Sequence, residues 1–182
     1  MPQPLIELLF AGPKHRIYFL ADGSHSTPRD LAERLHAAGG LAALLRRQPK
    51  LEAKKESPPD WKKLLAPIQR TAMEGLEMTA RNPSRVKCFV PPEAHTRGER
   101  MEVGEFKGAH HRAFFFREEP PRPEPCTTLI ITHIYSDKKR NETPAEELVR
   151  FADLRTRYYR WRDSLGAQDA VTALSRCNPR DP

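Results

Sequence analysis

The chain has 182 residues, enough for one domain with a sizeable core, but only 38% of them are hydrophobic, which predicts that part of it is loop or tail. Thirty-one Lys and Arg against 24 Asp and Glu give a net charge of +7, which favours polyanionic partners. No apolar run reaches the roughly 20 residues that cross a bilayer, and the N-terminus is a poor signal peptide, so we expect a cytosolic (cytoplasmic) protein with no membrane contact.

The first half of the chain is predicted to contain one strand and several helices. Residues 15–20 are rich in β-branched and aromatic side chains, which indicates a strand. A Thr-Pro pair at 27 and 28 is typical of a helix start, and apolar residues at helical spacing follow it. Residues 46–60 are charged and proline-bearing, which predicts an exposed insertion. The next helix is expected over 61–78, kinked or split at Pro67.

The second half is predicted to be mostly β-structure followed by one helix. Candidate strands lie at 86–90, 103–107, 111–116 and 127–135. Gly108 and Ala109 suggest a tight hairpin, and the prolines of residues 117–125 predict an exposed loop. Thr143, Pro144 and Glu146 form a capping-box pattern at the start of an arginine-rich amphipathic helix.

Taken together, this order predicts an α+β fold with a small antiparallel sheet packed against N-terminal helices and a C-terminal helix. We expect one domain over residues 1–165, with insertions at about 46–60 and 117–125. Residues 166–182 are predicted to be a C-terminal tail.

Four side chains on neighbouring strands are candidates for chemistry. Alternation along the strands places Ile131, His133 and Tyr135 on one face of the last strand. An antiparallel sheet could therefore gather Lys107, Arg112, His133 and Tyr135, with Lys138 and Lys139 at the rim. The register is not fixed by the sequence, so this convergence is a hypothesis.

Such a cluster suits phosphate chemistry without a metal. Cations stabilise the charge that develops on phosphorus oxygens, and a histidine can move protons near neutral pH. RNA supplies its own nucleophile, the 2′-hydroxyl. No His, Asp and Glu residues have clear metal-ligand spacing, and three dispersed cysteines without a C-x-x-C pair argue against a zinc site. We expect no metal and no organic cofactor.

Each of these features also has a structural interpretation. The Lys-Lys-Arg run at 138–140 is typical of a solvated surface. His133 lies between apolar residues, as a hydrogen-bonded core histidine does. The arginines at 150–162 fit the wet side of an amphipathic helix.

Residues 103–160 resemble the RelE/HigB superfamily of type II toxins, in particular its phage-derived HigB-like branch. The residues that carry the resemblance are Glu105-Phe106-Lys107, Arg112 with Phe114 to Phe116, Leu129 to Tyr135 containing His133, Lys138-Lys139, Thr143-Pro144, and the helix through Arg157-Tyr158. The chain departs from the pattern in having Lys107 and Ile134 where arginine and glycine are usual.

The resemblance implies a RelE-like fold and a toxin of a toxin–antitoxin system. It implies a ribosome-associated, metal-independent mRNA endoribonuclease that inhibits translation and is held inactive by a cognate antitoxin protein. Lys107 and Arg112 would stabilise the transition state, His133 would transfer protons, and Tyr135 would orient the 2′-hydroxyl. RNA backbone would be bound by Lys138, Lys139, Arg140 and Arg157.

Three other interpretations stay open. The first is a non-catalytic protein of the same fold that binds RNA, the ribosome or a protein through its basic face. The second is a toxin directed at DNA gyrase. The third is a phage-encoded interaction protein whose basic charge has no catalytic meaning. A gene for a small helix-turn-helix antitoxin beside this one would favour the toxin.

Overall fold

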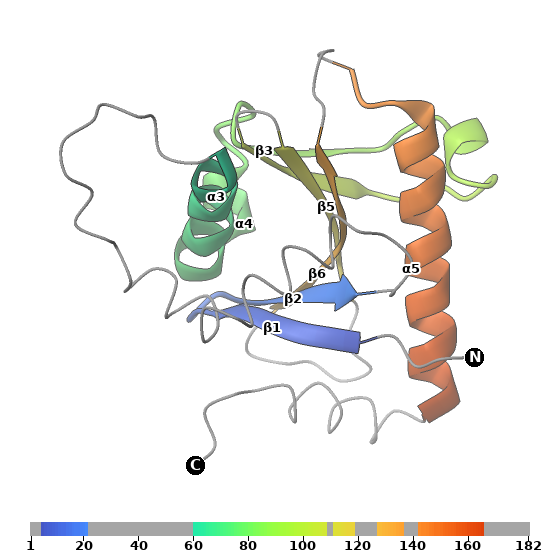
Figure 1. The fold of residues 1–182 in the computed structure, drawn as a ribbon, viewed down its shortest axis with the longest axis horizontal. Coiled ribbons are helices and arrows are strands. Elements are labelled where there is room, and N and C mark those ends of the chain that lie inside the picture. Colours follow the sequence, from blue (N-terminus) through green and yellow to red (C-terminus); the bar gives the residue numbers. More distant parts are fainter. Residues whose placement is uncertain (1–4, 22–59, 109–110, 119–126, 137–141, 166–182) are drawn as a thin grey trace, which may run out of the picture.

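A six-stranded mixed sheet forms the centre of the described part of the chain (Figure 1). The computed structural model describes residues 5–21, 60–108, 111–118, 127–136 and 142–165. The strands are β1 (Leu5–Ala11), β2 (His15–Ala21), β3 (Val86–Phe89), β4 (Val103–Lys107), β5 (His111–Arg117) and β6 (Thr127–Ser136). The helices are α3 (Asp60–Glu74), α4 (Leu76–Thr79), α5 (Ala145–Leu165) and the short 3-10 helix η1 (Glu93–His95).

The strand order is β1-β2-β6-β5-β4-β3, which confirms an α+β fold but corrects the predicted sheet. Strands β3 to β6 pair antiparallel, as expected, and Gly108 N–H donates to His111 O at 2.8 Å across the predicted hairpin. However, β2 pairs parallel with β6, so the sheet is mixed and not purely antiparallel. Strand β1, which the sequence analysis did not predict, completes the edge beside β2.

Several predictions fall outside the described residues. These are the helical region at 28–45, the insertion at 46–60 except its last residue, most of the loop at 117–125 and the tail at 166–182. Of the proline-rich loop, Arg117 and Glu118 belong to the described fold, where Glu118 N–H donates to Thr128 O at 2.9 Å.

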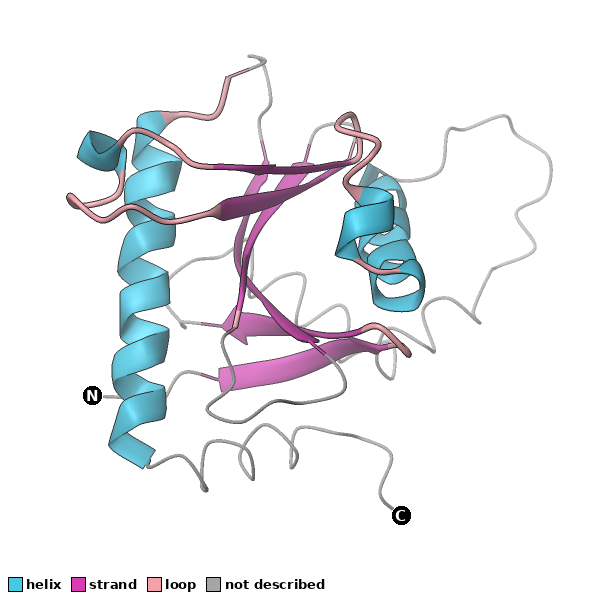
Figure 2. Cartoon of the chain, turned by 180° about the vertical axis from the view of Figure 1, so that it is seen from behind, coloured by secondary structure: helices cyan, strands magenta, loops and turns pink. Residues whose placement is uncertain are grey.

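Helices cover both faces of the sheet, with α3 and α4 on one face and α5 on the other (Figure 2). Ile68 and Leu76 pack with Phe106, Phe115 and other apolar side chains on the α3 face. On the α5 face, the core includes Phe114, Phe116, Phe151 and Tyr158. Burial of both sheet faces explains why the strands read as nearly continuous apolar runs.

The break between helices α3 and α4 lies at Gly75 and not at Pro67. Helix α3 continues through Pro67, whose carbonyl accepts a hydrogen bond from the Thr71 hydroxyl at 2.8 Å. The chain turns at Gly75, where φ is 98°, a backbone conformation that favours glycine. The prediction of a split at Pro67 was therefore wrong, and the helix instead ends before Gly75, the residue with the positive φ.

A β-bulge in β6 places Ile131 on a different face of the sheet from the one predicted. Phe114 lies opposite His133, but Phe115 lies opposite Ile131, so Thr132 is the extra residue. As a result Ile131 packs on the α3 face, while His133 stacks on Phe114 on the α5 face. The expectation that Ile131 shares a face with His133 and Tyr135 was wrong, because the bulge interrupts the alternation of side chains.

His15 links the first residue of α4 to the first residue of β6. Its Nε2 accepts a hydrogen bond from Leu76 N–H at 2.8 Å, and its Nδ1 lies 3.3 Å from Thr127 O. Because one ring nitrogen accepts and the other faces a carbonyl, the contacts fit the neutral ring with its proton on Nδ1. Burial is the main cause that lowers the pKa of His15.

We expect His15 to make stability fall in mild acid. Because its pKa is lowered in the folded protein, its contribution is complete above the unfolded value of about 6.5 and is lost as the pH falls towards the folded value. Urea unfolding between pH 7.5 and 5 measures this, and His15→Gln should show a smaller loss. His95→Gln, in η1, is the matched control. Equal pH dependence in wild type and His15→Gln would contradict the assignment.

Among the described helices, none is both long and apolar enough to cross a membrane. The 21-residue helix α5 has the length, but five arginines and four carboxylates lie along it: Arg150, Arg155, Arg157, Arg160, Arg162, Glu146, Glu147, Asp153 and Asp163.

Candidate functional site

The register brings the predicted catalytic residues together in two adjacent rows across the sheet. Lys107 lies opposite Arg112, and Arg112 lies opposite Tyr135. In the next row, Glu105 lies opposite Phe114, and Phe114 lies opposite His133. Residues directly opposite one another share a face, so both rows face α5. Lys107, Arg112, His133 and Tyr135 therefore share one face of the sheet, whereas the predicted rim residues Lys138 and Lys139 lie outside the described residues.

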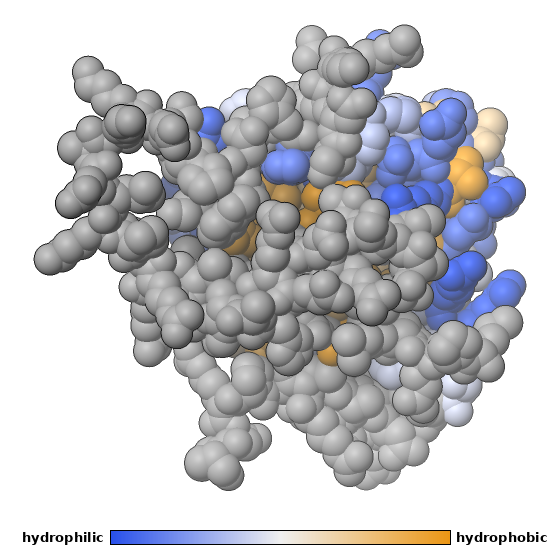
Figure 3. Space-filling view, in the orientation of Figure 1, coloured by the Kyte–Doolittle hydropathy of each residue, from blue (hydrophilic) through white to orange (hydrophobic). Residues whose placement is uncertain are grey.

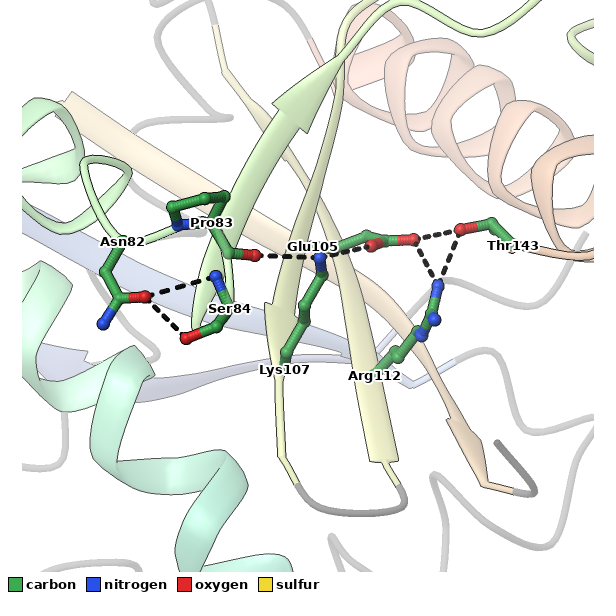
Figure 4. Close-up of polar contacts among 7 residues, drawn as sticks. All are labelled: Asn82, Pro83, Ser84, Glu105, Lys107, Arg112 and Thr143. Atoms are coloured by element: carbon green, nitrogen blue, oxygen red, sulfur yellow. Dashed lines mark hydrogen bonds and ion pairs between the residues drawn. The ribbon is translucent and has the colours of Figure 1, made fainter. Parts of the chain in front are cut away.

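Arg112 is buried in a network that joins β4, β5 and the start of α5 (Figure 4). Its Nη1 donates to Thr143 Oγ1 at 2.9 Å and to Glu105 Oε1 at 3.3 Å. The Thr143 hydroxyl donates to the same carboxylate oxygen. Only 3% of the Arg112 side chain and 1% of the Glu105 side chain are exposed. We call Glu105, Arg112 and Thr143 the Glu105 latch.

The Glu105 latch changes the role of Thr143. The sequence pattern predicts that its hydroxyl caps α5, but the hydroxyl is bound by Glu105 and Arg112, and α5 begins at Ala145. A carboxylate and a guanidinium are stronger partners than a backbone N–H, which explains the difference. The capping-box interpretation was wrong in its chemistry, although it located the start of the helix within two residues.

His133 is fully buried and both of its ring nitrogens face oxygen atoms. Nε2 lies 2.9 Å from Glu147 Oε2, and Nδ1 lies 2.9 Å from Thr132 Oγ1. The Glu147 carboxylate accepts from Nε2–H, so His133 ties β6 to the first turn of α5. At the other ring nitrogen, Nδ1 contacts the Thr132 hydroxyl, whose oxygen also lies 3.2 Å from Phe114 O.

Lys107 and Tyr135, at the two ends of the first row, are less enclosed than Arg112. The Lys107 ammonium donates to Pro83 O at 2.9 Å and lies 3.9 Å from Glu105 Oε2, with 17% of the side chain exposed (Figure 4). Tyr135 is partly buried against the α5-side core. These two side chains lie closest to solvent in the row.

The predicted RNA-binding residues are described only in part. Arg157 is exposed on α5. Mostly hydrophilic side chains cover the side of the molecule where α5 and η1 lie (right in Figure 3). Lys138, Lys139 and Arg140 lie outside the described residues.

Sequence reasoning assigned no role to Glu105 or Glu147, which hold Arg112 and His133. A signal for Glu105 was present, since a carboxylate inside the apolar strand VGEFK requires a buried partner. Glu147 gave no comparable signal, because the first turn of a helix often carries acidic residues.

The described residues hold no group of three or more His, Cys, Asp or Glu side chains that could bind a metal. Burial raises the pKa of the Cys88 thiol to about 11, so this cysteine is a weak nucleophile near neutral pH. The described side chains of the candidate site contribute cations, hydroxyl groups, an imidazole and buried carboxylates.

No known family matches. Family models, curated proteins and solved structures were compared with the chain, and no match was found in any of the three. What characterises the candidate site is its own geometry and the order of the sequence motifs between residues 103 and 160.

Proposed function

We propose that this protein is a toxin of the RelE/HigB kind that inhibits translation by cutting mRNA on the ribosome without a metal, and that a cognate antitoxin restrains it. The observation that carries the proposal is the convergence of residues from the resembling segment. Glu105, Lys107, Arg112 and His133 lie on one sheet face, and Thr143, 38 positions after Glu105, packs against that face through Glu105 and Arg112. A local architecture in common with the RelE/HigB toxins would explain why these residues occur in the same order along the chain.

In this proposal, Lys107 and Tyr135 contact RNA, and Arg112 and His133 are positioning residues. Lys107 places a cation near the scissile phosphate, where it stabilises charge that grows on the phosphorus oxygens. Tyr135 orients the 2′-hydroxyl or stacks on a base. Arg112 lies between them in the row and is fixed by the Glu105 latch, while His133 and Glu147 fix the start of α5.

The burial of Arg112 and His133 favours a second candidate, a non-catalytic protein of the same fold that binds RNA or the ribosome. Both residues are held by carboxylates, with 3% and 0% of their side chains exposed. If the Arg112 guanidinium and the His133 imidazole do not reach the bound RNA, the protein keeps a basic surface for binding. It then has fewer side chains that can stabilise charge or transfer protons.

Induced expression with genome-wide mapping of RNA 5′ ends separates the two candidates. The toxin proposal predicts growth arrest with new 5′ ends inside translated messages. Arrest with intact messages would support the binding protein, or a toxin directed at gyrase if DNA supercoiling changes. Folded protein with no effect on growth would contradict a toxin.

A further inference from the structure

A groove with a basic rim lies on the opposite side of the sheet from the candidate site. It is formed by α3, α4 and the turn that leads into β3, and it has a volume of about 630 Å³. Four cationic side chains line it: Lys63, Arg70, Arg81 and Arg85. None of the described residues that line it is acidic.

Two of these cations are available to a ligand. Arg81 and Arg85 are exposed, and no carboxylate of the described residues lies within ion-pair distance of either. Arg70 is already paired, since its Nε lies 2.7 Å from Glu74 Oε2. The rim next to β3 therefore carries uncompensated positive charge.

Apolar side chains line the groove between these cations, together with the polar Thr79 and Asn82. Pro67 and Val86 contribute to it, and Met78 stands beside them with 52% of its surface exposed. Exposed methionine is common at surfaces that adapt to a peptide, because its side chain is flexible and polarizable. A second methionine, Met73 of α3, is 53% exposed.

These features favour a peptide over a nucleic acid. Single-stranded nucleic acids bind on aromatic side chains against which bases stack, and no aromatic residue is among those lining the groove. An apolar lining inside a basic rim complements a segment with apolar anchors and flanking carboxylates.

We propose that this groove is a docking site for an acidic amphipathic segment of a partner protein. The segment places an apolar side chain against Met78 and carboxylates against Arg81 and Arg85. The proposal does not rest on ribonuclease activity. Helix α5 lies on the other face of the sheet from α3 and α4 (Figure 1), and Glu105 shares that face because it lies opposite Phe114.

The test uses the whole chain with methyl-labelled methionine and a defined probe. The probe is a fluorescent peptide of about 16 glutamate and leucine residues, with leucine at helical spacing. We expect it to bind and to shift the NMR signal of Met78, assigned with Met78→Leu. The signal of Met101, which is 5% exposed on the α5 face, should not move and reports the fold.

Charge reversal then tests the rim. Arg81→Glu with Arg85→Glu should weaken peptide binding on the order of tenfold. Arg100→Glu with Arg160→Glu makes the same change in net charge at exposed positions outside the groove, and should leave binding nearly unchanged.

Three results would overturn the proposal. The first is peptide binding that leaves Met78 unshifted. The second is equal weakening by the two pairs of charge reversals. The third is a single-stranded oligouridine that shifts Met78 and displaces the peptide, which would make the groove a nucleic-acid surface. None of these results bears on the proposed ribonuclease function, which is tested separately by mapping RNA 5′ ends.

Discussion

Replacement of Glu105 by alanine is expected to destabilise the protein by about 3–5 kcal/mol, because it leaves the buried Arg112 guanidinium without its carboxylate. The exposed fraction of the Glu105 side chain is only 1%, so water cannot readily replace it. The change also removes the acceptor of the Thr143 hydroxyl and so frees the start of α5. Urea unfolding at neutral pH measures the loss.

Two variants control this experiment. Glu102→Ala removes an exposed carboxylate just before β4 and should change stability little. Glu105→Leu combined with Arg112→Met replaces both charges by apolar groups of similar volume and should recover most of the loss. A loss below about 1 kcal/mol for Glu105→Ala, the value of an exposed ion pair, would show that Arg112 is not dependent on this carboxylate.

Lys107→Met is the substitution expected to reduce activity most while the protein stays folded. By analogy with the removal of one oxyanion-stabilising donor, single-turnover cleavage of mRNA on stalled ribosomes should slow by ~10²–10³. Stability should change less than in Glu105→Ala, because Lys107 lies at the rim with 17% of its side chain exposed.

The matched control is Arg157→Ala on the exposed side of α5. It should weaken binding and reduce the salt dependence by about one charge, without a large change in the rate at saturating protein. Lys107→Arg should recover part of the rate because it keeps the cation. If Lys107→Met cleaves at a near-normal rate, the row that ends at Lys107 is not the reactive site.

The strands and the hairpin were predictable because their signals are local. Aromatic and β-branched runs located β2 to β6 closely, and the Gly108 hairpin fixed the antiparallel pairing of β4 with β5. The parallel pairing of β2 with β6 was not predictable, since more than 100 residues separate the two strands and no local pattern states which edge β2 joins.

The sequence did not predict on which sheet face each site residue lies or which side chains it contacts. One extra residue at Thr132 moved Ile131 to the α3 face, against simple alternation. The burial of Arg112 and His133 followed from carboxylates on other elements, Glu105 and Glu147. A motif of cations therefore located the site, but the tertiary contacts decide which of its members can meet a substrate.

The chemistry of the RNA ends tests the central claim most directly. Attack by the 2′-hydroxyl expels the 5′ oxygen, so cleavage leaves a 2′,3′-cyclic phosphate on one fragment and a 5′-hydroxyl on the other. We expect purified protein to produce these ends on mRNA bound to stalled ribosomes, and Lys107→Met to produce few. Fragments with 5′-phosphate ends, or intact mRNA with folded protein bound to the ribosome, would contradict a metal-independent ribonuclease at this site.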